Sequence, residues 1–218
     1  NPFSGCEELE NIVAPMAVIN KVDKNVLRNY LRSVTLTTNA SVDNYAFSEC
    51  KKLTEINIPS GVSAIGSYAF SGCERLQTIN MLGELETIGY RAFADCTALT
   101  RIDLPNGLKA VGDEAFSGCT GLNEITIPGS VERFGVGALQ NTQIYNDAKN
   151  WENGVLYLGD VLIEASGSVD SAYVINDGTR LIAKRAFTNN ESLESVTMPD
   201  SVADIGYGAF YNCINLKH

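Results

Sequence analysis

The sequence predicts a repeat solenoid: a right-handed coil with one short β-strand per repeat of about 23 residues, a mostly parallel sheet and one inserted β-hairpin. Three observations support this prediction. A phrase built on an Ala-Phe pair recurs, a strand-like run follows each copy, and a cysteine stands at one fixed place in the phrase. The pairs are residues 46/47, 69/70, 92/93, 115/116, 186/187 and 209/210, with Ala138-Leu139 as a variant.

The run after each phrase alternates aliphatic and polar residues, as in LTEINIP, LQTINML, LTRIDLP, LNEITIP and LESVTMP. Alternation with a period of two is typical of a half-buried strand. Proline closes most such runs, and its missing N–H ends strand pairing. These prolines are Pro15, Pro59, Pro105, Pro128 and Pro199. One repeat buries too little apolar surface to fold alone, so neighbouring coils must share a continuous core.

Two stretches depart from the repeat. In the irregular unit 16–30, VDKNVLRNY replaces the usual phrase, and Val22, Val26 and Tyr30 fall on one helical face. This spacing predicts a short helix on the convex side of the coil.

The second departure is an insertion at about 141–172. Its segment GVLYLGDVLIEA predicts two alternating strands joined at Gly159-Asp160, a favourable two-residue hairpin turn. The single tryptophan, Trp151, precedes this hairpin. We interpret it as a cover for the hairpin's apolar face, with a binding role as the alternative.

The cysteines occupy one position of the repeat, three residues after a Phe and three before a Leu. They are Cys6, Cys50, Cys73, Cys96, Cys119 and Cys213. Disulfide frameworks cross-link different positions, whereas these side chains should point inward in parallel as small buried thiols. Asn190 stands at the same place in another repeat and can also bond a turn's backbone. We therefore predict a reduced column, with disulfides between adjacent coils as the alternative.

The phrases have the form IGxxAFxxCxxLxxIxLP at 65–81, 88–105, 111–128 and 205–216, with the variant LIAKRAFTNNESLESVTMP at 181–199. They resemble the BspA-like leucine-rich repeat family of bacterial, and some protist, surface proteins, over nearly the whole chain. The resemblance implies a leucine-rich-repeat-like coil and a surface-displayed, partner-binding role. The family has no shared catalytic residues that could be assigned to positions in this chain.

We expect a single solenoid domain over residues 1–218. NPFSGCEELENI begins inside a unit and AFYNCINLKH stops where another strand should begin, which predicts a fragment of a longer chain.

Charge and residue usage exclude several classes of function. The net charge of −10 disfavours nucleic acid and anionic membranes as partners, and no apolar run is long enough to insert into a membrane. The single histidine is His218, and the cysteines form no Cys-x-x-Cys pair, so neither a catalytic triad nor a zinc site is predicted. We expect no enzyme activity, no metal and no cofactor.

In each strand-like run, the residue between two inward aliphatics must point to the opposite face. This places Thr35, Asn57, Asn80, Asp103, Thr126 and Thr197 in one column. The flanking column is Ser33, Glu55, Thr78, Arg101, Glu124 and Ser195. We call the surface formed by these two columns the strand face, and expect it to be concave.

The candidate partner-binding residues on this face are Glu55, Asn57, Thr78, Asn80, Arg101, Asp103, Glu124 and Thr126. The charged ones stand where we expect the sheet to be flattest and least interrupted. The alternative, for any one of these residues, is that it is simply a solvent-exposed strand residue and has no role in binding.

From these observations we predict a non-catalytic, adhesin-like protein-binding module of a bacterial cell-surface or secreted protein. Its expected ligand is a protein, with host extracellular matrix and serum proteins as candidates. The alternatives are a glycan-binding module, which the strand face disfavours because it lacks aromatic side chains, and an inert spacer that displays a neighbouring domain. A hidden enzyme is the weakest alternative.

Overall fold

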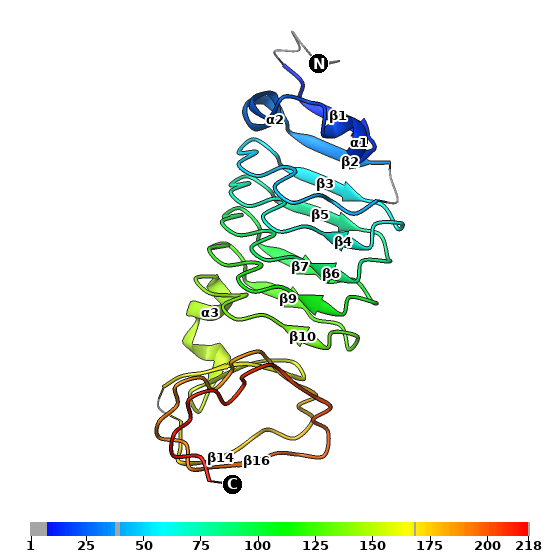
Figure 1. The fold of residues 1–218 in the computed structure, drawn as a ribbon. Coiled ribbons are helices and arrows are strands. Elements are labelled where there is room, and N and C mark those ends of the chain that lie inside the picture. Colours follow the sequence, from blue (N-terminus) through cyan, green and yellow to red (C-terminus); the bar gives the residue numbers. More distant parts are fainter. Residues whose placement is uncertain (1–7, 38–39, 168, 218) are drawn as a thin grey trace. The chain divides into compact units, whose positions relative to one another are not determined.

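The computed structural model describes residues 8–37, 40–167 and 169–217, which form a β-solenoid of mostly parallel strands (Figure 1). The chain divides into two compact units. Unit 1 contains Asn1–Val131 and Gly137–Asn146, and unit 2 contains Glu132–Val136 and Asp147–His218. The solenoid predicted from the repeats is confirmed, and the single domain over 1–218 stays a prediction.

In unit 1, one strand of each coil lies parallel to the strand of the next. The first sheet has the order β1 (Asn11–Ala14), β2 (Ser33–Leu36), β3 (Glu55–Ile58) and β5 (Thr78–Met81), and a separate pair consists of β7 (Arg101–Asp103) and β9 (Glu124–Thr126). Asn57 lies opposite Asn80, and Asp103 lies opposite Thr126. The predicted strand runs therefore stack in the register of the repeat.

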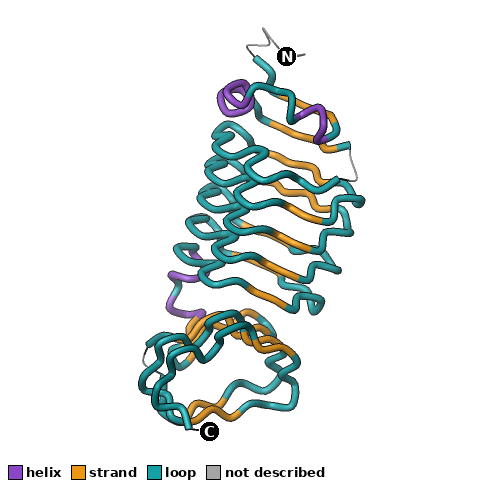
Figure 2. Tube along the Cα trace, in the orientation of Figure 1, coloured by secondary structure: helices purple, strands orange, loops and turns teal. Residues whose placement is uncertain are grey.

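The coils of β3, β5 and β7 also carry a second strand of two residues. These strands are β4 (Ala64–Ile65), β6 (Thr87–Ile88) and β8 (Ala110–Val111), which pair in parallel (Figure 2). The sequence analysis predicted only one strand per repeat. A strand of two residues is too short to show a recognisable alternation of apolar and polar residues, so this second set of strands was not predicted.

The Ala-Phe phrase folds as a series of turns in which alternate N–H groups reach the next coil. In one coil, Phe70 donates to the oxygen of Ala92 and Gly72 donates to that of Ala94, both over 2.8 Å. The chain turns in this way at two residues of each phrase that have a positive φ. In the coil of Phe70 they are Tyr68, at 57°, and Gly72, at 75°. The turns thus join neighbouring coils without regular strands.

The core of unit 1 is a column of phenylalanines from successive phrases. Phe47, Phe70, Phe93 and Phe116 are fully buried. Adjacent rings stack nearly parallel, with centroids 5.2, 5.2 and 5.6 Å apart. The Ala-Phe pair therefore faces the core, as the repeat predicts.

Gly66, Gly89 and Gly112 begin their phrases at a place where two coils touch. A Cβ on Gly112 would lie 2.6 Å from the carbonyl carbon of Gly89, which is backbone and cannot turn away. Close approach of the coils is thus the reason for glycine at this position.

The irregular unit contains α1 (Met16–Ile19) and α2 (Lys24–Tyr30). The predicted helix is therefore present. Its first turn is capped by the Asp23 carboxylate, which accepts a hydrogen bond from the N–H of Asn25 over 2.8 Å. Its buried residue is Leu27, whereas Val26 and Tyr30 are half-buried. A third helix, α3 (Gln143–Asn146), follows the last phrase of unit 1.

Unit 2 contains the predicted hairpin within a mixed sheet. The sheet order is β11 (Trp151–Glu152), β12 (Val155–Leu158), β13 (Val161–Ala165), β15 (Leu181–Ile182) and β17 (Asp204–Ile205). The antiparallel strands β12 and β13 turn at Gly159-Asp160, where Gly159 has a φ of 60°. Trp151 is half-buried and lies opposite Leu156 of this hairpin.

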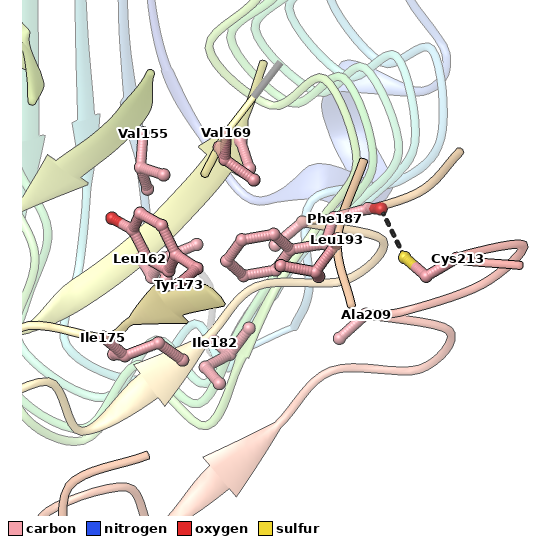
Figure 3. Packing of buried hydrophobic residues seen from close by; sticks show 12 residues of the cluster. Val155, Leu162, Val169, Tyr173, Ile175, Ile182, Phe187, Leu193, Ala209 and Cys213 are labelled. Atoms are coloured by element: carbon pink, nitrogen blue, oxygen red, sulfur yellow. Dashed lines mark hydrogen bonds between the residues drawn. The ribbon is translucent and has the colours of Figure 1, made fainter. Parts of the chain in front are cut away.

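The other elements of unit 2 are β10 (Arg133–Phe134), the 3-10 helix η1 (Ala148–Asn150), and the parallel pair β14 (Ala172–Val174) and β16 (Ser195–Thr197). The core of this unit is built around Phe187, whose ring meets that of Tyr173 edge-on at 5.7 Å (Figure 3). The same hydrophobic cluster includes Leu162, Ile182 and Leu193.

The described cysteines, Cys50, Cys73, Cys96, Cys119 and Cys213, are buried and unpaired, which confirms the predicted reduced column. Cys213 Sγ donates to the backbone oxygen of Phe187 over 3.0 Å (Figure 3). Asn190 has the same role, because its Nδ2 donates to the oxygen of Ser166 over 2.7 Å. Cys6 lies outside the described residues.

Candidate functional site

The strand face consists of the outward residues of β3, β5, β7 and β9. On β3, Ile56 and Ile58 are buried while Glu55 and Asn57 are half-exposed. The same alternation continues on the other three strands, so all eight candidate residues point away from the core. Seven of them fall into two groups with different chemistry, and the eighth, Thr78, is exposed at the start of β5.

The first group is a ladder of amides, which we call the amide ladder. Asn80 Nδ2 donates to Asn57 Oδ1 over 2.7 Å, and Asn57 Nδ2 donates to Thr35 Oγ1 over 3.2 Å. Glu55 Oε1 accepts from both amides, at 3.2 and 3.4 Å. The amides of successive coils are therefore fixed in one orientation.

The second group, the charged cluster, consists of Arg101, Asp103, Glu124 and Thr126. The Arg101 guanidinium donates to both Asp103 oxygens over 3.0 and 3.1 Å, and its Nη1 lies 2.8 Å from Glu124 Oε1. Thr126 Oγ1 donates to Asp103 Oδ1 over 2.7 Å. The hydrogen bonds from Arg101, followed by that from Thr126, lower the pKa of Asp103 below its ordinary value.

The strand face is interrupted between these two groups. In the other coils, the two residues at the start of the strand donate N–H groups to the preceding coil, as Asn123 and Glu124 do to the Thr100 oxygen. Among the described residues, Thr100 and Arg101 make no such bond, and no ladder pairs β5 with β7. Our expectation that the sheet is least interrupted at the charged residues is therefore wrong.

The interruption coincides with a change in the turn after β5. Pro59 and Pro105 close the corresponding turns of the neighbouring coils, where their oxygens accept hydrogen bonds from Val62 and Leu108. Leu82 occupies this position in the coil of β5 and is 64% exposed. The strand of that coil also buries its inward residues Ile79 and Met81 less than β3 buries Ile56 and Ile58.

The strand face offers exposed hydrogen-bonding groups held in place by one another. Three carboxylates, on Glu55, Asp103 and Glu124, accompany one guanidinium, on Arg101. Within the described ranges, no three His, Cys, Asp or Glu side chains gather as a metal site requires. No helix in those same ranges has the length and apolarity of a membrane span.

A second exposed feature of unit 1 was not predicted from the sequence. It lies on the surface formed by the phrases 43–50, 66–73, 89–96 and 112–119, which we call the turn face. Tyr45 and Tyr68 stand two residues before Phe47 and Phe70, and Tyr90 stands in the next phrase. Their rings contact one another across three coils. The signal in the sequence is that Tyr45 and Tyr68 occupy the same free position of the repeat in adjacent coils.

A family model described as the BspA type leucine rich repeat region matches residues 40–152 and 166–218, in six copies. Among solved structures, the chain is similar to a leucine rich cell surface protein from Faecalibacterium prausnitzii, with 27% identity and a TM-score of 0.50. This match covers 95% of the chain and 63% of that protein, so the chain spans less than two thirds of its length.

A leucine rich repeat protein from T. pallidum matches with 24% identity and a TM-score of 0.54, over 95% of the chain and 84% of that protein. This second likeness concerns the fold alone. The comparison with curated proteins finds no match.

Proposed function

Because the chain belongs to the BspA-type leucine-rich repeat family, we propose that it is a non-catalytic, adhesin-like protein-binding module, displayed on a bacterial cell surface or secreted. Its ligand is a protein, and host extracellular matrix and serum proteins are the candidates to test first. The likeness to a cell surface protein of Faecalibacterium prausnitzii supports the location.

The observation that carries this proposal is the arrangement of the strand face. Asn57, Asn80, Arg101 and Asp103 are held by hydrogen bonds between or within coils before any ligand arrives. A prearranged surface loses little side-chain freedom on binding, which favours affinity. The sheet of a solenoid is also the surface that repeat proteins commonly use for partners.

The chemistry of the two columns favours a protein over a glycan. Both columns consist of short polar or charged side chains and contain no aromatic ring on which a sugar could stack. Charged groups of mixed sign instead suit a protein surface of complementary charge.

The test is capture of matrix and serum proteins by the chain, run beside a glycan array. The variant is Arg101→Glu/Glu124→Lys, which exchanges the partners of the 2.8 Å ion pair and preserves the net charge. The matched control is Lys109→Glu/Glu86→Lys, an exchange of another exposed ion pair of 3.2 Å in unit 1, away from the strand face. Both variants should melt at the temperature of the parent chain.

Protein capture that is lost in the Arg101/Glu124 exchange and kept in the Lys109/Glu86 exchange supports the proposal. Equal capture by all three proteins contradicts the strand face as the site. Binding to the glycan array alone favours the glycan alternative.

A further inference from the structure

The turn face of unit 1 carries a continuous row of tyrosines, the tyrosine ridge, made of Tyr45, Tyr68 and Tyr90. The rings of Tyr45 and Tyr68 stack with centroids 4.8 Å apart and planes 8° apart. The Tyr90 ring meets Tyr68 at 5.2 Å and nearly at right angles. Tyr45 is 55% exposed and Tyr90 is 38% exposed, so the ridge lies at the surface and outside the core.

Two of these tyrosines occupy an unfavourable backbone conformation. Tyr45 and Tyr68 have φ angles of 58° and 57°, in the left-handed region that bulky side chains avoid. The other phrases also have a positive φ at this place, on Arg91, Glu114, Gly137, Arg185 and Gly208, so the turn itself imposes the conformation. The stacked rings, and not the backbone, therefore distinguish Tyr45 and Tyr68 from the other residues at this place.

The ridge already holds one cation, which belongs to the chain itself. The Arg91 guanidinium lies 5.9 Å from the centre of the Tyr68 ring, within the range of a cation–π contact. It also lies 3.7 Å from the Asp95 carboxylate and 3.6 Å from that of Glu114. Its Nε is buried and has no hydrogen-bond partner. The surroundings of Tyr68 thus accommodate a guanidinium by ring and carboxylates together.

The same pairing recurs independently in unit 2. There the Arg185 guanidinium lies 5.4 Å from the centre of the Tyr211 ring, within the corresponding turns of that unit. Tyr211 is itself exposed. Contact between a guanidinium and a surface tyrosine is therefore a recurring property of these turns.

The charge of the turn face is complementary to further cations. Its phrases contain five acidic residues, Asp43, Glu49, Asp95, Asp113 and Glu114, and one basic residue, Arg91. Lys24 and Arg28 of α2 also lie against this face, where they donate to the oxygens of Ala46 and Ser48, so the face including them has a net charge of −2 from five acidic and three basic groups. Carboxylates beside exposed rings favour lysine and arginine side chains, which gain a cation–π contact and an ion pair together.

We propose that the tyrosine ridge binds a basic, extended segment of a partner protein, whose arginine or lysine side chains lie against the rings as Arg91 does. Tyrosine rings supply contact area at low entropic cost because they have few rotatable bonds. Tyr and Arg are also enriched among the residues that dominate binding energy at protein interfaces. This site is separate from the strand face and does not depend on the function proposed above.

The test measures the affinity of a labelled peptide of alternating arginine and glycine by fluorescence anisotropy, with a glutamate–glycine peptide as the charge control. In Tyr45→Asn/Tyr68→Asn both rings are removed, and asparagine is chosen because it tolerates a positive φ. The net charge is unchanged, so any general attraction between an acidic protein and a basic peptide remains. The matched control is Tyr207→Asn, which removes an exposed tyrosine of unit 2.

The Tyr45/Tyr68 variant should bind the arginine peptide about tenfold more weakly, as expected for two exposed cation–π contacts. Tyr45→Phe/Tyr68→Phe, Tyr207→Asn and the Arg101/Glu124 exchange on the strand face should bind as the parent chain does. If the double asparagine variant melts early, Tyr45→Asn alone is compared with Tyr45→Phe at the more exposed ring.

Equal affinity of the ring-free and parent chains would overturn the proposal, because the attraction would then be general electrostatics. Loss of binding in the phenylalanine variant as well would overturn it too, since the hydroxyls and not the rings would carry the contact. Ring-dependent binding to a glycan array, with none to the basic peptide, would assign the ridge to sugars instead.

Discussion

The Sγ atom of Cys96 donates a hydrogen bond to the backbone oxygen of Phe70 over 3.3 Å and so joins two consecutive coils through their interior. Cys73 bonds Phe47 in the same way at 3.2 Å, and Cys119 bonds Phe93 at 3.0 Å. Each thiol must keep its proton to make this bond, which couples the stability of the solenoid to pH.

The first prediction is a loss of stability in alkali. Burial raises the pKa of Cys50 from 9.0 to about 12, and burial also raises the pKa values of Cys73 and Cys96. The thiols therefore ionise first in the unfolded chain. Their contribution to stability is complete below about pH 9 and is lost as the pH rises toward 12.

This prediction is checked by denaturant unfolding at a series of pH values from neutral to about pH 11. The free energy of unfolding should fall above about pH 9, and the fall should be smaller in Cys96→Ala, which has one fewer buried thiol. An identical decline in the parent and variant chains would show that other groups cause the alkaline effect.

The second prediction concerns the exchange of asparagine and cysteine at one position. Asn190 is buried, donates to the Ser166 oxygen and accepts from Ser192 Oγ over 2.8 Å. Asn190→Cys keeps a small donor at this place and should cost less than Asn190→Leu. The leucine leaves the Ser166 oxygen without its donor, at about 1–3 kcal/mol for a buried group. Ser192 is exposed and keeps its hydrogen bond to the Val169 oxygen, so it adds little to this cost.

Thermal unfolding of the two variants provides the measurement for this exchange. The cysteine variant should melt clearly above the leucine variant. The reverse order would mean that apolar packing, and not the hydrogen bond to the turn, decides which residue this column accepts.

The sequence was sufficient for those parts of the fold that repeat. The Phe column and the thiol column each arise from one residue type at one fixed spacing, and the strand register arises from one alternating pattern at that same spacing, so a single physical reason applies in every coil. The hairpin was also predictable, because its turn at Gly159-Asp160 depends only on local backbone preferences.

The parts that were missed depend on contacts between coils. The interruption between β5 and β7 coincides with a changed turn, in which Leu82 stands in place of a proline, and the strand runs themselves give no sign of it. The tyrosine ridge was missed for a different reason. Tyr45 and Tyr68 occupy the same free position of the phrase, but the free positions carry no period-two pattern and differ in residue type from coil to coil.

The third prediction uses two glycines that differ only in their surroundings. In Gly112→Ala, the new Cβ would lie 2.6 Å from the carbonyl carbon of Gly89 and 2.7 Å from its oxygen. Cβ atoms in proteins do not approach other heavy atoms so closely, so the two coils must move apart. This movement would disturb the β6–β8 pairing beside them. In Gly129→Ala, nothing lies within 4 Å of the new Cβ.

Gly112→Ala should therefore be strongly destabilising, by a few kcal/mol, as typical for overpacking against groups that cannot yield. Gly129→Ala should be neutral or slightly stabilising, because alanine restricts the unfolded chain. Denaturant midpoints give the comparison, and similar midpoints for both variants would mean that the coils can separate at Gly112 without cost.

The fourth prediction is that Phe93→Asp is among the most damaging single changes. Phe93 is fully buried and stacks on Phe70 at 5.2 Å and on Phe116 at 5.6 Å. Removing the ring costs about 3–5 kcal/mol for the aromatic core residue, and the aspartate adds an unpaired buried charge. Damage should spread to both neighbouring coils, because each ring provides the surface on which the next one packs.

Phe93→Leu separates the two effects, since it leaves an apolar side chain in the column and introduces no charge. It should fold with reduced stability, whereas Phe93→Asp should expose amides of the coils containing Phe70 and Phe116 to hydrogen exchange. Tyr90→Asp serves as the surface control, because it places the same charge three residues away on the exposed turn face. If Phe93→Asp kept the exchange protection of the Tyr90 variant in those coils, the phenylalanine column would not be what holds neighbouring repeats together.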